Sequence, residues 1–274
     1  MEHSISEILS YTFMQRALIV GVPVALCAAL LGMSLILKRY SMIGDGLSHV
    51  GFGALALAAA MNLAPLKVAI PVVIVSAFLL LRISENSKIN GDGAIAIVSS
   101  SALAIGIVVT SVAGGLNTDL YSYLFGSILA LSHDDVVLSL ILCAIVLFMY
   151  IFFYNKIFSV TFDENFSLAT GTNAKAYNLV ISLLTALTVV LGTQIMGTLL
   201  ISSLIIFPGL TAMRVFKSYK AVVISAAIQS VFCVVVGLFV SFYAETATGA
   251  TVVCVNLVCF MIFGIIGFLR TIKK

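Results

Sequence analysis

Long apolar stretches recur along the whole chain, separated by short polar segments. Most run for about 20 residues, the length that an α-helix needs to cross the hydrocarbon core of a bilayer. The pattern therefore predicts an all-α polytopic membrane protein with about nine transmembrane helices, within a range of eight to ten. The predicted spans are about 17–37, 42–61, 65–82, 94–113, 136–155, 177–193, 196–213, 221–243 and 251–269.

One segment, residues 119–132, fits this pattern poorly. It is too short to span a membrane comfortably, and it contains Gly126 and Ser127. A re-entrant or interfacial half-helix is the structure expected there. No soluble appendage interrupts the pattern, so residues 1–274 are predicted to form a single transmembrane domain.

Charged residues in the loops predict the orientation of the chain. The loops that follow the even-numbered spans carry Asn62, Asn117, Asp119 and Glu245 and almost no basic residue. Since an excess of Lys and Arg marks cytoplasmic loops, the C-terminus is expected in the cytoplasm and the N-terminus outside. The basic residues that follow the odd-numbered spans are Lys38, Arg39, Arg82, Lys88, Lys156, Lys175, Arg214, Lys217, Lys220, Arg270, Lys273 and Lys274.

Composition supports the membrane assignment and excludes several functions. Hydrophobic residues make up 62% of the chain and charged residues 9%, and the mean hydropathy is +1.22. A soluble domain has roughly 25% charged residues, so this chain cannot cover itself with a polar surface. The net charge of +3 lies in loops and does not suggest nucleic-acid binding. The GxxxxGK[ST] phosphate loop does not occur in the sequence, so we expect a transport subunit and not an ATP-hydrolysing enzyme.

The second predicted span carries two polar residues within the run MIGDGLSHVGFG, residues 42–53. Asp45 and His49 are four residues apart, so they lie on one helix face about one turn apart. A carboxylate and an imidazole are both ligands for zinc, manganese or iron. A charged Asp in hydrocarbon costs a few kcal/mol on insertion scales, and a bound cation offsets that cost.

Two other interpretations of this pair stay open from the residues alone. An intramembrane His is often a hydrogen-bonded packing residue, and an Asp near the end of a span can be solvated or can cap the helix. Two ligands also leave a four-coordinate site incomplete. Asp119 is the next candidate ligand, whereas residues 133–135 fit a solvated loop better.

A short helix is predicted in the loop between the fifth and sixth spans, at about residues 162–170. Thr161 and Glu164 form a T-x-x-E capping box, and Gly171 can end the helix in a left-handed conformation. Such a helix either lies on lipid or docks into a groove of a soluble partner. The apolar side chains that it presents with no core of its own are Phe162, Phe166 and Leu168.

Several runs in the correct order resemble the permeases of zinc, manganese and iron ABC importers, the ABC-3 family. LKRYSMIGDGLSH resembles the family signature after the first span, with Gly46 where Ala is common. Further matches, over nearly the whole chain, are TDLYSYLFGSILALSHDD, VTFDENFSLATG, MGTLLISSLIIFPGLTA and ATGAT.

The resemblance implies a type II-like importer permease fold and specific roles for the motifs. Asp45 and His49 correspond to the metal-coordinating pair, and Asp119 matches the Asp that opens the D-L motif. Residues 162–170 correspond to the coupling helix, although Asn165-Phe166-Ser167 lacks an alanine often found there. The residues that would dock the ATPase are Phe162, Asp163, Glu164, Phe166, Leu168 and Gly171.

The predicted function is the permease subunit of an ABC importer in a bacterial cytoplasmic membrane. Its substrate would be a divalent transition metal ion, with zinc favoured over manganese and iron, and no cofactor would be bound permanently. Expected partners are ABC ATPase subunits, an extracytoplasmic metal-binding protein and a second permease subunit, forming a homodimer. The main alternatives are a secondary cation transporter or channel that needs no ATPase, and a permease for a chelated metal or cobalamin-like solute.

Overall fold

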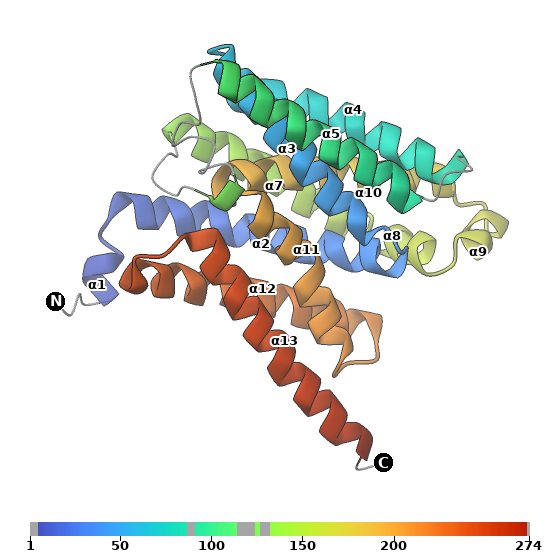
Figure 1. The fold of residues 1–274 in the computed structure, drawn as a ribbon. Coiled ribbons are helices and arrows are strands. Elements are labelled where there is room, and N and C mark those ends of the chain that lie inside the picture. Colours follow the sequence, from blue (N-terminus) through green and yellow to red (C-terminus); the bar gives the residue numbers. More distant parts are fainter. Residues whose placement is uncertain (1–4, 87–90, 114–123, 127–131, 273–274) are drawn as a thin grey trace.

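The computed structural model describes residues 5–86, 91–113, 124–126 and 132–272 (Figure 1). The regular elements within these ranges are all helices. In chain order they are α1 (Ile5–Ile8), α2 (Thr12–Leu37), α3 (Ser41–Ala60), α4 (Pro65–Asn86), α5 (Gly91–Val112), α7 (His133–Phe152), α8 (Tyr154–Phe162), α9 (Glu164–Ala169), α10 (Ala174–Met196), α11 (Thr198–Met213), α12 (Tyr219–Ala244) and α13 (Thr248–Ile272).

Eight of the described helices are long and apolar enough to cross a membrane, namely α2, α3, α4, α5, α7, α10, α12 and α13. Helix α11 is also apolar but has only 16 residues. With α11 included, each predicted span corresponds to one helix in the same order, so the predicted all-α polytopic fold is confirmed. Most of the segment 119–132 lies outside the described residues, and its predicted re-entrant form stays a prediction.

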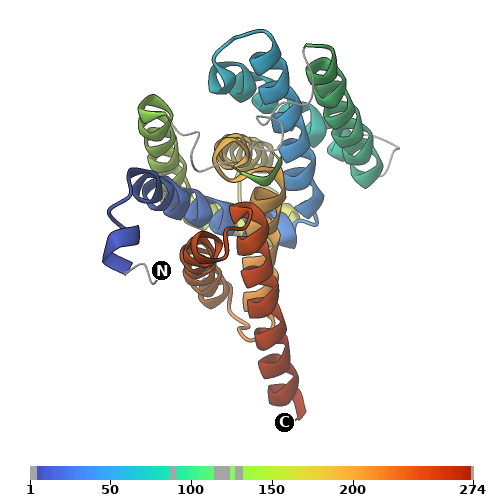
Figure 2. The ribbon, with the colours of Figure 1, turned by 60° about the vertical axis from the view of Figure 1, so that its left-hand side comes forward.

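The helices form a bundle with a buried centre and two exposed flanks. Helices α2, α3 and α10 are the most buried of the eight, whereas most of α5 and α13 is exposed. Helices α4 and α5 lie along one flank beside α3, and α12 and α13 form the other (Figures 1 and 2). Helix α13 runs along the end of α11, where a Cβ atom at Gly267 would stand 2.6 Å from the carbonyl oxygen of Arg214, and its C-terminal end projects from the bundle.

A sharp reversal at Gly197 joins α10 to α11. Its φ of 84° and ψ of 160° lie in a region that essentially only glycine adopts. A Cβ atom at this position would also stand 2.4 Å from the backbone nitrogen of Gly126. The Thr198 hydroxyl donates to the carbonyl of Leu124 at 3.4 Å. The reversal thus packs directly against the described residues 124–126.

Contacts between distant segments gather the basic loops at one end of the bundle. Lys38 after α2 pairs with Glu164 of α9, and the rings of Phe158 and Tyr219 join α8 to the start of α12 at 4.7 Å. Arg270 of α13 reaches the carbonyl of Val215, 3.5 Å away. We call this the basic end. That it faces the cytoplasm stays a prediction.

Candidate functional site

Helix α3 starts from a tight connection to α2 at the basic end. Arg39 has a φ of 60°, and the amide of Tyr40 donates to the carbonyl of Leu35 at 2.8 Å. The amide of Ile43 then donates to the carbonyl of Tyr40 at 2.9 Å and begins the next helix. Residues 38–40 therefore fix the direction in which α3 leaves the end of α2.

Asp45 and His49 lie one turn apart on α3, as the sequence predicts. Nε2 of His49 is 3.8 Å from Oδ2 of Asp45, and the side chains are 26% and 36% exposed, respectively. Two ligands with bonds of about 2.1 Å to one tetrahedral cation stand about 3.4 Å apart. A shift of a few tenths of an ångström would let both atoms bind the same ion.

Ser48 holds the same turn of α3 against α11. Its hydroxyl donates to the carbonyl of Asp45 at 2.7 Å and lies 3.1 Å from the hydroxyl of Ser202. Since the Ser48 proton is directed to Asp45, the Ser202 hydroxyl is the donor between the two serines, and its proton is shared with the carbonyl of Thr198, also 3.1 Å away. The two serines form an interhelical hydrogen bond of the kind expected for polar residues within a span.

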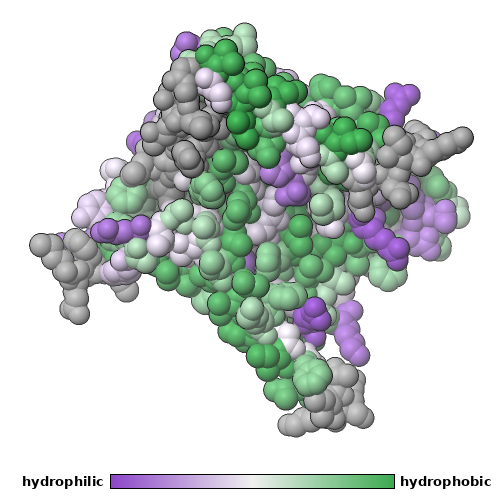
Figure 3. Space-filling model, viewed as in Figure 1, coloured by the Kyte–Doolittle hydropathy of each residue, from purple (hydrophilic) through white to green (hydrophobic). Residues whose placement is uncertain are grey.

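Small residues let neighbouring helices approach α3 closely, at Gly53, one turn beyond His49 on the same face, and at Gly44 in the first turn. A Cβ atom at Gly53 would stand 2.6 Å from the carbonyl oxygen of Ala102, so the backbones of α3 and α5 are in contact. At Gly44, a Cβ atom would meet Ile205 of α11 at 3.0 Å. The pair itself stays partly exposed. The face of the molecule in Figure 3 is largely apolar, with some hydrophilic side chains in its middle.

The described part of the chain brings two candidate ligands together at this site. Within it, no group of three His, Cys, Asp or Glu residues lies close enough to hold a metal ion. Asp119, the third predicted ligand, lies outside the described residues. His133 and Asp135 belong to the first turn of α7, where Ser132 caps the helix by accepting from the amide of Asp135.

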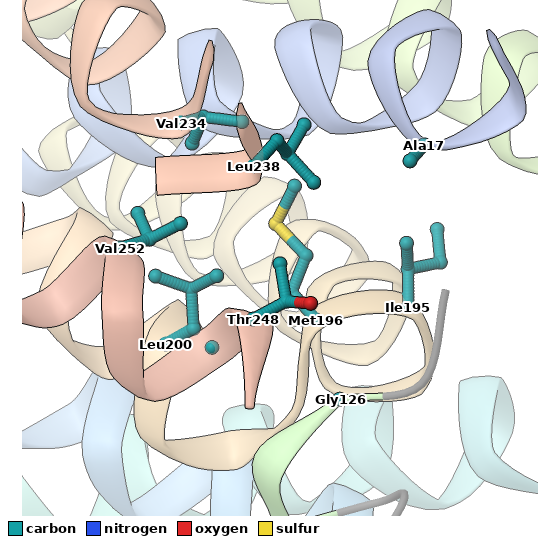
Figure 4. A pocket seen from close by; sticks show the side chains of 10 residues that line it. Ala17, Gly126, Ile195, Met196, Leu200, Val234, Leu238, Thr248 and Val252 are labelled. Atoms are coloured by element: carbon teal, nitrogen blue, oxygen red, sulfur yellow. The ribbon is translucent and has the colours of Figure 1, made fainter. Parts of the chain in front are cut away.

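A small enclosed cavity near the Gly197 reversal offers no alternative site. Side chains of Met196, Leu200 and Leu238 gather around it (Figure 4). Its lining is almost wholly apolar, and its volume of about 10 Å³ is that of a single water molecule. This cavity therefore does not compete with the partly exposed Asp45–His49 pair as a site for an ion.

The predicted loop helix forms, but its cap differs from the prediction. Helix α9 covers Glu164–Ala169, not 162–170, and its N-cap is Asp163, which accepts from the amide of Phe166 at 2.9 Å. The predicted capping box is wrong because Thr161 still belongs to α8. Gly171, with a φ of 78°, follows the C-cap, as predicted.

The side chains of α9 divide into an outward and an inward group. Phe162, Phe166 and Leu168 are all exposed. The Glu164 side chain is 44% exposed, yet its carboxylate reaches the bundle and contacts Lys38 and Asn178. These two partners of Glu164 were not predicted from the sequence, where Lys38 indicates only the orientation of the chain. Asn178 is a lone polar residue near the start of an apolar span, and this position could have indicated a polar partner from another helix.

With this geometry established, comparison with known proteins gives the family. The sequence profile described as the ABC 3 transport family matches residues 10–267. The chain belongs to the ABC 3 transport family.

Other members of the ABC 3 family resemble the chain over nearly its full length. It is 29% identical over 246 residues to the high-affinity zinc uptake system membrane protein ZnuB of Haemophilus influenzae, covering 90% of this chain and 94% of that one. It is 30% identical to the manganese transport system membrane protein MntC of Listeria monocytogenes, covering 93% and 91%. A probable iron transport system membrane protein of H. influenzae is 31% identical, covering 93% and 94%.

Solved structures share the fold. PsaBC from Streptococcus pneumoniae, in complex with Fab, superposes with a TM-score of 0.84 at 31% identity, covering 94% of this chain and 93% of that one. A metal-chelate type ABC transporter in an inward-facing conformation gives 0.72 at 14% identity, covering 96% and 92%, which supports the fold alone. The predicted ABC importer permease fold is thus confirmed for this ABC 3 family chain.

Proposed function

We propose that this chain is the permease subunit of an ABC importer that moves a divalent transition metal ion into the cytoplasm. The observation that carries the proposal is the Asp45–His49 pair, with a carboxylate oxygen and an imidazole nitrogen 3.8 Å apart on a half-open face of α3. Both are ligand types for zinc, manganese and ferrous iron. Relatives named for zinc, manganese and iron match the chain about equally well, in support of this cargo class.

Two copies of the chain would complete the coordination shell. The described part of one copy offers the pair alone, and a second copy related by a two-fold axis would bring another Asp45 and His49. Four ligands then surround the ion near the axis. A site shared between copies comes apart when the copies tilt, so it can release the ion, as transport requires.

ATP hydrolysis would take place on separate ABC ATPase subunits that dock at the basic end. The exposed Phe162, Phe166 and Leu168 beside α9 offer the apolar anchors that a helix presents to a groove. An extracytoplasmic metal-binding protein would deliver the ion at the opposite end. The location that follows is the cytoplasmic membrane of a bacterium, with the basic end inside.

The test is metal uptake into liposomes that contain the permease together with its ATPase and are supplied with metal-loaded binding protein. Radioactive zinc or manganese should accumulate only with ATP, and the competing cold ion that suppresses uptake most strongly identifies the cargo. Asp45→Ala and His49→Ala should each lower uptake by about 100-fold, since removing a ligand costs at least as much as losing its outer-shell support.

Two results would contradict the proposal. Undiminished uptake in both variants, with the ATPase still bound, would remove the pair from the pathway. Equal uptake by the purified permease alone and without ATP would instead identify a secondary transporter or channel.

A further inference from the structure

Three polar side chains from distant parts of the sequence close a ring at the basic end. Lys38, at the end of α2, donates to Oε2 of Glu164 at 3.2 Å and also to Oδ1 of Asn178. Asn178, in α10, donates through Nδ2 to Oε1 of Glu164 at 3.2 Å. The ring therefore ties the first residue of α9 to both α2 and α10.

The ring is a firm connection because its cation is buried. The side chain of Lys38 is only 7% exposed, and Asn178 is also buried. A buried ammonium group strongly resists the loss of its counterion, since the charge would be left uncompensated. Glu164 is the described acidic group that pairs with it, and its own side chain is 44% exposed, so the ring has a buried Lys38 side and a Glu164 side that faces solvent beside α9.

Lys38, on the α2 side of the ring, is close in sequence to the candidate metal pair. Lys38 belongs to residues 38–40, which turn the chain sharply from α2 into α3. Asp45 and His49 lie in the first half of α3, within three turns of that connection. A displacement of Glu164 toward or away from the bundle thus acts on the start of the helix that holds both ligands.

The same helix that carries Glu164 directs its apolar side chains outward. Phe166 and Leu168 are exposed, whereas Ser167 is buried and lies 2.8 Å from the hydroxyl of Ser159. Helix α9 therefore has one side available to a partner and the other joined to the bundle through Glu164. A helix that transmits the movement of a docked partner to the membrane-spanning helices requires these two separate contact sides.

We propose that the Lys38–Glu164–Asn178 ring transmits the movement of the docked ATPase to α3 and so sets the spacing of the metal ligands. This proposal rests on the proposed function. Glu164 is in this view a positioning residue that acts through Lys38 and does not touch the metal or dock the ATPase itself. This role replaces the one expected from the sequence, in which Glu164 was one of several docking residues.

The experiment compares metal ions transported per ATP hydrolysed in the reconstituted complex. Glu164→Gln and Lys38→Gln should keep ATPase binding and ATP hydrolysis, and the ratio of metal to ATP should fall about tenfold, within the range typical of coupling between two sites. The double swap Lys38→Glu with Glu164→Lys restores opposite charges and should recover most of the ratio. Lys175→Gln, which removes an exposed cation near Asn178, is the matched control and should leave the ratio unchanged.

The outcomes separate the ring from the function on which it rests. An unchanged ratio in both single variants would overturn the ring, while ATP-driven uptake by the parent complex would still uphold the proposed function. Loss of ATPase binding in Glu164→Gln alone, measured by co-purification, would assign Glu164 to docking and also overturn the ring. If Glu164→Gln does not fold, Glu164→Asp replaces it, because it keeps the charge and shortens the reach; a parental ratio there would overturn the proposal.

Discussion

Helices α3 and α13 are both long enough to cross a membrane, yet they have opposite surroundings. In their most apolar windows, 67% of α3 is buried inside the chain, against 11% of α13. Helix α13 is nevertheless the most apolar of the eight candidate spans, and α3 is the least. In lipid the exposed helix must be apolar all round, whereas polar groups are tolerated only in the interior. The weakly apolar and buried α3 is therefore the span in which the polar groups of a candidate site can be accommodated.

The largest expected effect is on metal uptake, and it comes from a substitution in α3 that should not lower the stability of the protein. Asp45→Leu should lower metal uptake by about 100-fold, because one ligand of each pair is lost. The same change should leave the thermal unfolding temperature equal or higher, since it removes a carboxylate whose burial in the membrane costs about 3 kcal/mol. Uptake and unfolding in detergent are measured on the same preparation. A variant that loses both uptake and stability would show that Asp45 serves packing.

The next effect compares two glycines, one from each helix. Gly53→Ala should destabilise the permease by about 1–3 kcal/mol, because its Cβ atom would overlap the backbone of α5. Gly264→Ala in α13 is the matched control, since nothing lies within 4 Å of its Cβ position. It should change stability by less than about 1 kcal/mol. Thermal unfolding in the same detergent measures both, and equal losses would refute the contrast.

The smallest effect concerns the hydrogen bond that holds α3 to α11. Ser48→Ala and Ser202→Ala should each cost about 0.6 kcal/mol, the average for such bonds within membranes. Because the two hydroxyls share one contact of 3.1 Å, the double variant should cost less than the sum of the single variants. The double-mutant cycle is measured by unfolding in detergent. Additive losses would mean that the two hydroxyls do not interact.

The sequence predicted the spans well because hydrophobic length is a local property. The predicted start of the fifth span at residue 136 was late, since α7 already begins at His133 with polar residues in its first turn. The Asp45–His49 pair was predictable for a similar reason, because helix periodicity alone places residues four apart on one face. Which face stays open depended on the packing of α5 and α11, and no local pattern contained that information.

The cap of α9 shows where local reasoning failed. Glu164 fits a capping box with Thr161 in sequence, but its carboxylate is instead bound by Lys38, 126 residues away along the chain. Asp163 caps the helix instead, because it stands three residues before Phe166 and accepts from the amide of that residue. The role of Asn178 was not predicted, because its partners Lys38 and Glu164 come from two other parts of the fold. Contacts over such separations follow from the tertiary fold and not from any short motif.

The off-centre position of the pair has an electrical consequence. Asp45 and His49 are the fifth and ninth residues of α3, so they lie about 6 and 12 Å from its start in a helix about 30 Å long. With the basic end inside, an entering divalent ion crosses about two thirds of the membrane field before it reaches them. An inside-negative voltage would then contribute about 3 kcal/mol per 100 mV to loading and about half as much to release. The resting voltage of the cell would thus favour filling the site from outside and discourage backflow.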